Sequence, residues 1–184
     1  AAENNFLPDK YLKSEAFIQA NGMESMYELD EEKFLAANDS LYRMKMDFLS
    51  KTTGLDEQFR FYEEQTYDLE KRQALLSYPM MKRFSTGDMN FKVSNNFPDP
   101  MAGLNMNNDT LLAIPVFEQL LENHLFLLTG KIMQKSIGED FSVVCFAILD
   151  TTINNTEVKE QLAFSIVNMG IARSQHVEQL YAIY

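Results

Sequence analysis

Cysteine, tryptophan, histidine, glycine and proline are all scarce in this sequence of 184 residues. Cys145 is the only cysteine, which excludes an intrachain disulfide, a Cys-x-x-Cys redox pair and a zinc site built from several cysteines. Seven glycines and five prolines are too few for a turn-rich β-sandwich and favour long uninterrupted elements. The composition therefore predicts a largely helical protein.

Basic residues are also in deficit, with 16 lysines and arginines against 27 acidic residues, a net charge of −11. This acidity disfavours binding to nucleic acid or to anionic lipid, because both require clustered positive charge. The longest apolar run, Val143 to Leu149, is far shorter than the roughly 18 residues that a membrane-spanning helix needs. We therefore expect no nucleic-acid partner and no membrane insertion.

Motifs for metal binding and catalysis are missing as well. A di-metal helix bundle requires Glu-x-x-His, but Leu121 precedes His124 by three residues and Arg173 precedes His176. There is no phosphate-binding glycine loop and no nucleophile elbow, and Cys145 lies in an apolar run typical of a buried thiol. We accordingly assign no catalytic, cofactor-binding or metal residue, expect no cofactor, and do not expect an enzyme.

Two strong helical segments are predicted between residues 30 and 78. The first begins with Asp30 as N-cap and ends at Gly54, with one apolar stripe of Phe34, Ala37, Leu41, Met44 and Phe48. The second begins at Asp56 and is expected to end at Tyr78-Pro79, since proline pushes the preceding residue out of helical geometry. Its acidic residues, Glu63 and Glu64 among them, are interpreted as a solvated outer side.

The flanking segments are less regular. Pro8 is expected to break the first dozen residues, and a short helix over 14–21 should end at Gly22. Residues 85–109 form one long irregular connection. We favour a strap packed across the helices over a mobile lid, because it carries regularly placed apolar anchors: Phe91, Val93, Phe97, Met101, Leu104 and Met106.

The C-terminal half predicts four more helices. One starts at Asp109 or Thr110 and continues from Pro115 to Gly130, the next covers 139–152, and another runs from the cap Thr156 to Met169. The last carries Val177, Leu180, Tyr181 and Tyr184 and stops as though the following element had been cut away. The fold class predicted for 1–184 is all-α: a single domain, an irregular bundle of about six to seven helices, and a fragment of a longer chain.

Some weaker features leave alternatives open. Eleven methionines and fourteen phenylalanines are enough to line a hydrophobic ligand groove, although at helical spacing they are more typical of a core. The oxygen-rich run 105–109 is interpreted as helix capping at Asn108 or Asp109 rather than as a calcium loop. Three triplets, starting at Asn38, Asn108 and Asn154, match the N-glycosylation pattern.

The order of several motifs along the chain resembles a known family. It runs through Leu55-Asp56-Glu57-Gln58-Phe59, Tyr62-Glu63-Glu64, Leu75-Leu76-Ser77-Tyr78-Pro79, Phe91-Lys92-Val93-Ser94, Leu104-Asn105-Met106-Asn107-Asn108, Ile114-Pro115-Val116-Phe117 and Leu121-Glu122-Asn123-His124-Leu125. This order is similar to the helical region that precedes the thioredoxin domain in TlpA-like thiol–disulfide oxidoreductases of bacterial envelopes. Segments 34–41 and 158–181 extend the resemblance over most of the chain.

The resemblance implies a role without chemistry. Family members carry a thioredoxin-fold domain with Trp-Cys-x-x-Cys after this region, and no position of the present sequence matches that motif. The chain would then be a non-catalytic accessory domain in the periplasm or cell envelope, lacking its thioredoxin-like domain. It would position that domain or contact the substrate protein; the alternative is a stand-alone module that binds a protein or a hydrophobic ligand.

Overall fold

The computed structural model describes residues 2–135 and 140–172, and within these ranges it contains helices and no strands. This confirms the all-α class and the irregular bundle of six helices. The helices are α1 (Ala2–Ala20), α2 (Glu31–Lys51), α3 (Glu57–Thr86), α4 (Pro115–Met133), α5 (Phe141–Thr152) and α6 (Thr156–Ala172), with 3₁₀ turns η1 (Met26–Glu28) and η2 (Asp109–Ala113).

The chain divides into two compact units, Ala1–Ala102 and Gly103–Tyr184. Each unit packs its own helices, and each is described by itself below. The expectation of a single domain stays a prediction.

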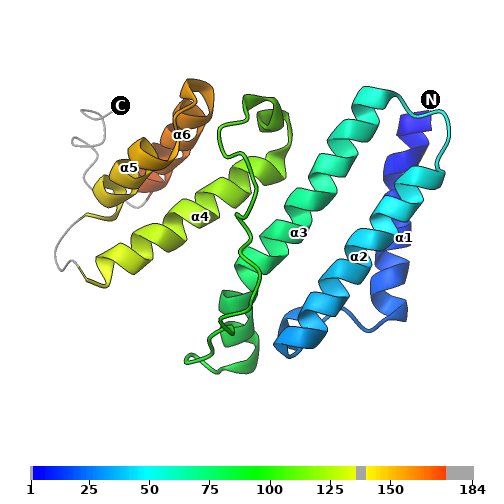
Figure 1. The fold of residues 1–184 in the computed structure, drawn as a ribbon, viewed down its shortest axis with the longest axis horizontal. Helices are drawn as coiled ribbons and strands as arrows, with labels where there is room; N and C mark the ends of the chain where they lie inside the picture. Colours follow the sequence, from blue (N-terminus) through cyan, green and yellow to red (C-terminus); the bar gives the residue numbers. More distant parts are fainter. Residues whose placement is uncertain (1, 136–139, 173–184) are drawn as a thin grey trace. The chain divides into compact units, whose positions relative to one another are not determined.

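Three helices that alternate in direction, α1, α2 and α3, build the first unit (Figure 1). The two predicted N-caps are confirmed: Asp30 Oδ1 accepts from the Lys33 amide at 3.0 Å, and Asp56 Oδ1 accepts from the Gln58 amide at 2.8 Å. Each cap satisfies a backbone donor that the first helical turn leaves free. These local signals set where α2 and α3 begin.

The prediction that Pro8 breaks the N-terminal segment is wrong, because α1 runs through it from Ala2 to Ala20. The turn before Pro8 is held by distant residues: the buried Phe6 ring stacks on Phe48 at 5.0 Å and meets the edge of Phe59 at 5.5 Å. These aromatic contacts stabilise a helix that Pro8 alone would interrupt. Gly22 follows α1 with a φ of 61°, as predicted.

The predicted end of the second strong helix at Pro79 is also wrong, since α3 continues to Thr86 and ends at the left-handed Gly87. Tyr78 is fully buried, its ring stacks on Phe34 at 3.9 Å, and its hydroxyl donates to the Leu29 carbonyl at 2.8 Å. The helical turn after Pro79 is held by Lys82, whose Nζ donates to the Glu28 carbonyl at 2.5 Å. Together these contacts offset the roughly 3 kcal/mol that an interior proline costs a helix.

The predicted strap after α3 is confirmed as an ordered, irregular segment that runs back along its own helix. Arg83 Nε donates to the Phe91 carbonyl at 2.9 Å, and Arg72 Nη1 donates to the Pro100 and Ala102 carbonyls at 2.9 Å each. The apolar anchors Phe91, Val93 and Phe97 pack against the buried cluster around Tyr78. The arginines thus satisfy backbone carbonyls of a segment that has no ladder of its own.

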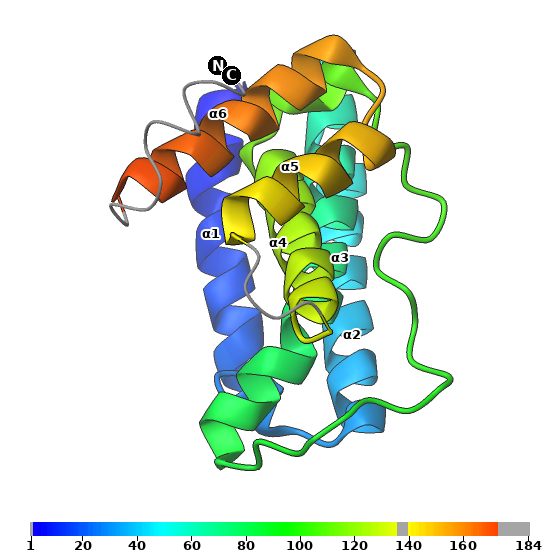
Figure 2. The ribbon, with the colours of Figure 1, turned by 90° about the vertical axis from the view of Figure 1, so that its left-hand side faces the viewer.

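In the second unit α4, α5 and α6 pack against one another (Figure 2). Asp140 caps α5, and α4 passes the predicted stop at Gly130 to end at Met133. The predicted cap of α6 is displaced by one residue, because Asn155 rather than Thr156 accepts from the Val158 amide at 3.1 Å. The expected last helix, with Val177, Leu180, Tyr181 and Tyr184, lies outside the described residues.

Candidate functional site

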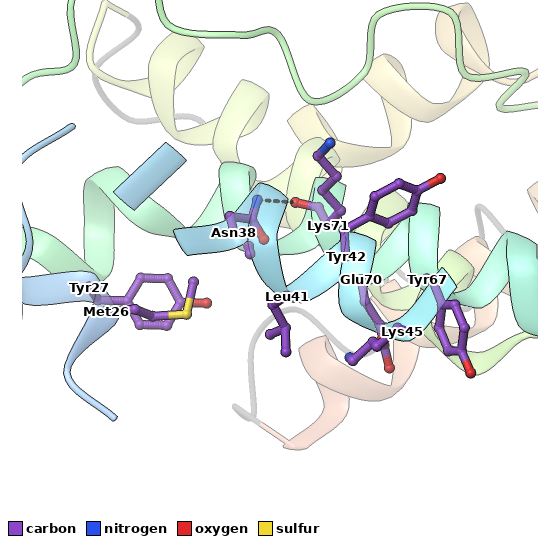
Figure 3. Close-up of a pocket in the computed structure, with 10 residues that line it drawn as sticks. Met26, Tyr27, Asn38, Leu41, Tyr42, Lys45, Tyr67, Glu70 and Lys71 are labelled. Atoms are coloured by element: carbon purple, nitrogen blue, oxygen red, sulfur yellow. Dashed lines mark hydrogen bonds and ion pairs between the residues drawn. The ribbon is translucent and has the colours of Figure 1, made fainter. Parts of the chain in front are cut away.

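The first unit contains two apolar clusters with a polar layer between them. One cluster is centred on the buried Phe6, Leu49, Leu55 and Tyr67, and the other on Phe34, Leu75 and Tyr78. A cavity of about 150 Å³ is lined by residues of both, with Tyr42 and Tyr67 from the first and Tyr27 and Ala74 from the second (Figure 3). Apolar, aromatic and charged side chains therefore meet at this cavity.

The charged walls of the cavity are matched internally by pairs between α2 and α3. Lys45 Nζ lies 2.7 Å from Glu70 Oε2, and Lys71 Nζ lies 2.8 Å from Asp39 Oδ1. The hydrogen bond from Lys71 lowers the pKa of the Asp39 carboxyl. Lys71 also lies 4.6 Å from the centre of the Tyr42 ring, so both lysines of the layer have a carboxylate and a fixed position.

Asn38 adds a neutral polar group to the same layer. Its side chain is buried, and its Nδ2 donates to the Lys71 carbonyl at 3.0 Å (Figure 3). Burial of Asn38 in the middle of α2 also makes the first glycosylation triplet inaccessible to modification in the folded protein. This hydrogen bond ties α2 to α3 within the polar layer.

Tyr67 forms one wall of the cavity and is the unsatisfied polar group of the layer. It is buried, and Lys10 and Lys45 lie 5.5 Å and 5.7 Å from the centre of its ring. Its hydroxyl makes no hydrogen bond of normal geometry with any described residue, although the Glu63 carboxylate is close enough to act on it. Burial, followed by the neighbouring carboxylates of Glu63 and Glu70, raises the pKa of Tyr67 well above its usual value.

Glu63 corrects a prediction made from the sequence. It was expected on a solvated side, yet it is only 8% exposed and its Oε2 lies 2.9 Å from Lys10 Nζ on α1. The reason is that Glu63 lies four residues before Tyr67, on the side of α3 that faces α1. A stripe through Tyr67, Leu75 and Tyr78 at helical spacing is the signal that would have placed Glu63 on the buried side.

The last turns of α3 and the residues that follow them expose large apolar side chains, which we call the Met/Phe end of α3: Met80, Met81 and Phe84 on the helix, and Met89 just after it. Their exposed fractions lie between 38 and 67%. Met80 and Phe84 are one helical turn apart, and Arg83 and Lys82 hold the same turn through the contacts described above. Exposed apolar groups on a fixed support are typical of a contact surface.

Polar residues of the second unit serve to join its elements. Asn107 Oδ1 accepts from the amides of Asn154 at 2.6 Å and Asn155 at 2.9 Å, and Asn155 Nδ2 donates to Asp109 at 3.0 Å. The sequence predicted a helix cap at Asn108 or Asp109. Asn108 precedes η2 without a side-chain bond, and Asp109 is the first residue of η2 and accepts from Asn155, so neither side chain caps the turn as predicted. The run 105–109 instead binds the turn between α5 and α6.

Cys145 is fully buried on α5, as its apolar neighbours predict. Burial raises the pKa of its thiol, while a hydrogen bond with Thr129 acts in the opposite direction. A thiol in this setting is held protonated and away from solvent, which disfavours reaction as a nucleophile. His124 is half-buried on α4. His176 lies outside the described residues.

Metal-binding and membrane-spanning features were sought in the same ranges. Residues 2–135 and 140–172 hold no cluster of three or more histidine, cysteine or acidic side chains able to bind a metal ion. Among the helices of the described part of the chain, none has the length and apolar character required to cross a bilayer.

Comparisons of the chain with protein-family models, with curated proteins and with solved structures gave no match. None of these comparisons links the chain to TlpA-like proteins, so that resemblance stays a prediction from the order of residues along the sequence.

Proposed function

We propose that this chain is a non-catalytic helical module that works by contacting another protein surface. The observation that carries the proposal is the Met/Phe end of α3, where three large apolar side chains on the helix and Met89 just after it are exposed. Tyr78, Lys82 and Arg83 hold the last turns of this helix. Methionine and phenylalanine bury large area on contact and adapt to varied partners. The polar layer supports this role by fixing α2 on α3.

The proposed partner is a thioredoxin-like redox domain of the same full-length protein, in the periplasm or cell envelope. The order of motifs from Leu55 to Leu125 supports this choice. In this role the chain positions the redox domain or contacts its substrate protein, and it transfers no electrons itself. A stand-alone interaction module is the second form of the proposal, supported by the same exposed side chains.

The proposal is tested by sequencing the full gene and, where it encodes a thioredoxin-fold domain, by titration calorimetry of the chain with that domain. Phe84→Ser is expected to weaken binding by at least about tenfold, because an aromatic anchor at an interface commonly contributes 2 kcal/mol or more. Phe164→Ser is the matched control, since Phe164 is 53% exposed and belongs to α6 of the second unit rather than to the Met/Phe end of α3.

Two results would contradict the proposal. If the Phe84→Ser and wild-type chains bound the redox domain with equal affinity, the Met/Phe end of α3 would not be part of the interface. Reduction of insulin disulfides by the chain alone, at a rate above that of the buffer thiol, would show that it is catalytic. A gene without a redox domain would leave the stand-alone form of the module and reject the accessory one.

A further inference from the structure

A groove between α1 and α2 is separate from the polar layer and from the Met/Phe end of α3. Its volume is about 650 Å³, within the range of small-molecule sites. The apolar part of its lining comes from half-buried side chains: Phe17 on α1, and Met44 and Phe48 on α2. These groups present rings and a flexible thioether rather than hydrogen-bonding atoms.

The charged groups of the groove are Lys13 on α1 and Asp47 and Lys51 on α2. Asp47 is already paired, because its Oδ2 lies 2.7 Å from Lys51 Nζ. Lys13 has no carboxylate partner among the described residues, and its Nζ lies 4.6 Å from the centre of the Phe48 ring. Two lysines against one aspartate therefore give the groove a local positive charge in a chain whose net charge is −11.

The placement of Lys13 over Phe48 joins the charge to the apolar wall. An ammonium group attracted to an aromatic face is kept beside the ring rather than extended into water. A ligand in contact with Phe48 therefore lies close to the unpaired ammonium group of Lys13. The most economical ligand has an apolar body for Phe17, Met44 and Phe48 and one negative charge for Lys13.

We propose that the groove between α1 and α2 binds a free single-chain amphiphile with an anionic head, a fatty carboxylate in chemical class. The carboxylate pairs with Lys13, and the hydrocarbon chain lies against Phe17, Met44 and Phe48. This binding site goes beyond the proposed protein contact and uses none of its residues.

Titration of the full chain with dodecanoate, below its micelle concentration, is the direct test. Saturable binding of one dodecanoate is expected. The affinity should rise by about two- to fourfold per added methylene from the ten- to the twelve-carbon acid, because each buried methylene contributes up to about 0.8 kcal/mol. Dodecanol and dodecyltrimethylammonium should bind at least about fivefold more weakly, although the acidic chain as a whole attracts the cation.

Variants locate the site. Lys13→Glu should weaken dodecanoate binding by about tenfold, and Ala16→Trp, which fills the groove from α1, should abolish it. Lys92→Glu makes the same charge change at an exposed lysine outside the groove. Ala147→Trp fills a different groove, between α4 and α5. Both controls should bind dodecanoate as the wild type does, and circular dichroism should confirm the fold of each variant.

Other outcomes would overturn the proposal. Equal affinities for dodecanol and dodecanoate would show that the charge of Lys13 does not contribute to binding. Unchanged dodecanoate binding in Ala16→Trp would show that the ligand binds outside this groove. Loss of binding in Ala147→Trp alone would assign the ligand to the groove between α4 and α5. Binding to phosphatidylglycerol vesicles as strong as to free dodecanoate would make the site a membrane contact and not a ligand groove.

Discussion

At the scale of single residues, the two buried tyrosines of α3 differ in one bond. Tyr78 donates to the Leu29 carbonyl at 2.8 Å, whereas the Tyr67 hydroxyl has only the Glu63 carboxylate nearby and makes no hydrogen bond of normal geometry among the described residues. We expect Tyr78→Phe to lower the free energy of unfolding by about 1 kcal/mol, because it removes a partly buried hydrogen bond and leaves the Leu29 carbonyl without this donor. Tyr67→Phe should be neutral or raise it by up to about 1 kcal/mol.

Urea denaturation of the two variants measures this difference, with the wild type and the double variant alongside. Each substitution removes one oxygen atom, so the change in packing is the same and the hydrogen bond is the variable. A larger loss of stability in Tyr67→Phe than in Tyr78→Phe would show that the Tyr67 hydroxyl has a partner of its own.

The same tyrosines predict how stability depends on alkaline pH. Burial raises the pKa of both groups in the folded chain above the ordinary value, which is about 10 when unfolded. A raised folded pKa stabilises the fold below about pH 10, and this stability is lost as the pH rises further. Tyr67→Phe should therefore move the alkaline unfolding midpoint upward, as followed by circular dichroism between pH 8 and pH 12. An unchanged or lower midpoint would contradict this assignment.

Glu63 shows where residue-level prediction from sequence fails. A glutamate next to a second glutamate is usually solvated, but Glu63 is paired with Lys10, which is 53 positions away and could not be inferred from local spacing. We expect Glu63→Ala to cost about 1–3 kcal/mol, since it leaves Lys10 half-buried without its partner.

Thermal unfolding of Glu63→Ala and of the exposed Glu64→Ala gives the comparison, and a double-mutant cycle with Lys10→Met isolates the pair. Glu64→Ala should change stability by less than about 0.5 kcal/mol. If Glu63→Ala lost as little stability as Glu64→Ala, the original interpretation of Glu63 as a solvated residue would be correct.

At the scale of elements, the starts of α2 and α3 were predictable, whereas the start of α1 and the effect of the two prolines were not. Asp30 and Asp56 cap the residues that follow them directly, so the signal is local and both starts were correct. The helix continues through Pro8 and through Pro79 because aromatic rings from other segments pack beside them. The residues next to each proline in the sequence do not indicate these contacts. Contacts between elements that contribute several kcal/mol therefore outweigh the helix-breaking tendency of a single proline.

Asn107 allows a prediction about a single connection. Because its side chain accepts from two successive amides between α5 and α6, Asn107→Ala should cost about 1–3 kcal/mol. Hydrogen exchange of the Asn154 and Asn155 amides should accelerate. Asn95→Ala, at an exposed strap asparagine without a side-chain bond, is the control. Unchanged exchange at both amides would mean that another group holds the turn.

At the scale of the whole molecule, the class of fold followed from composition while the candidate site did not. Few glycines and prolines were enough to predict helices. The polar layer, in contrast, depends on pairs such as Lys45 with Glu70 and Lys71 with Asp39, whose partners are 25 and 32 residues apart. The spacing of residues within one helix does not show which charged side chain of the next helix each of them will pair with.

The division into two units makes the single-domain expectation testable. Leu121 on α4 is buried in the second unit, and Leu121→Asp would place an unpaired charge there at a cost of several kcal/mol, comparable with the stability of a small domain. Because each unit has its own buried residues, we expect this variant to unfold the second unit and to leave the first folded.

Tyrosines provide the readout for this last experiment, since six of the eight lie in the first unit and the chain has no tryptophan. In Leu121→Asp the far-ultraviolet helix signal should fall while the near-ultraviolet signal of the tyrosines persists. Leu127→Asp, at a position of α4 that is 39% exposed, should preserve both signals. Simultaneous loss of both signals in Leu121→Asp would instead show one cooperative domain, because two independently stable units cannot transmit a core defect from one to the other.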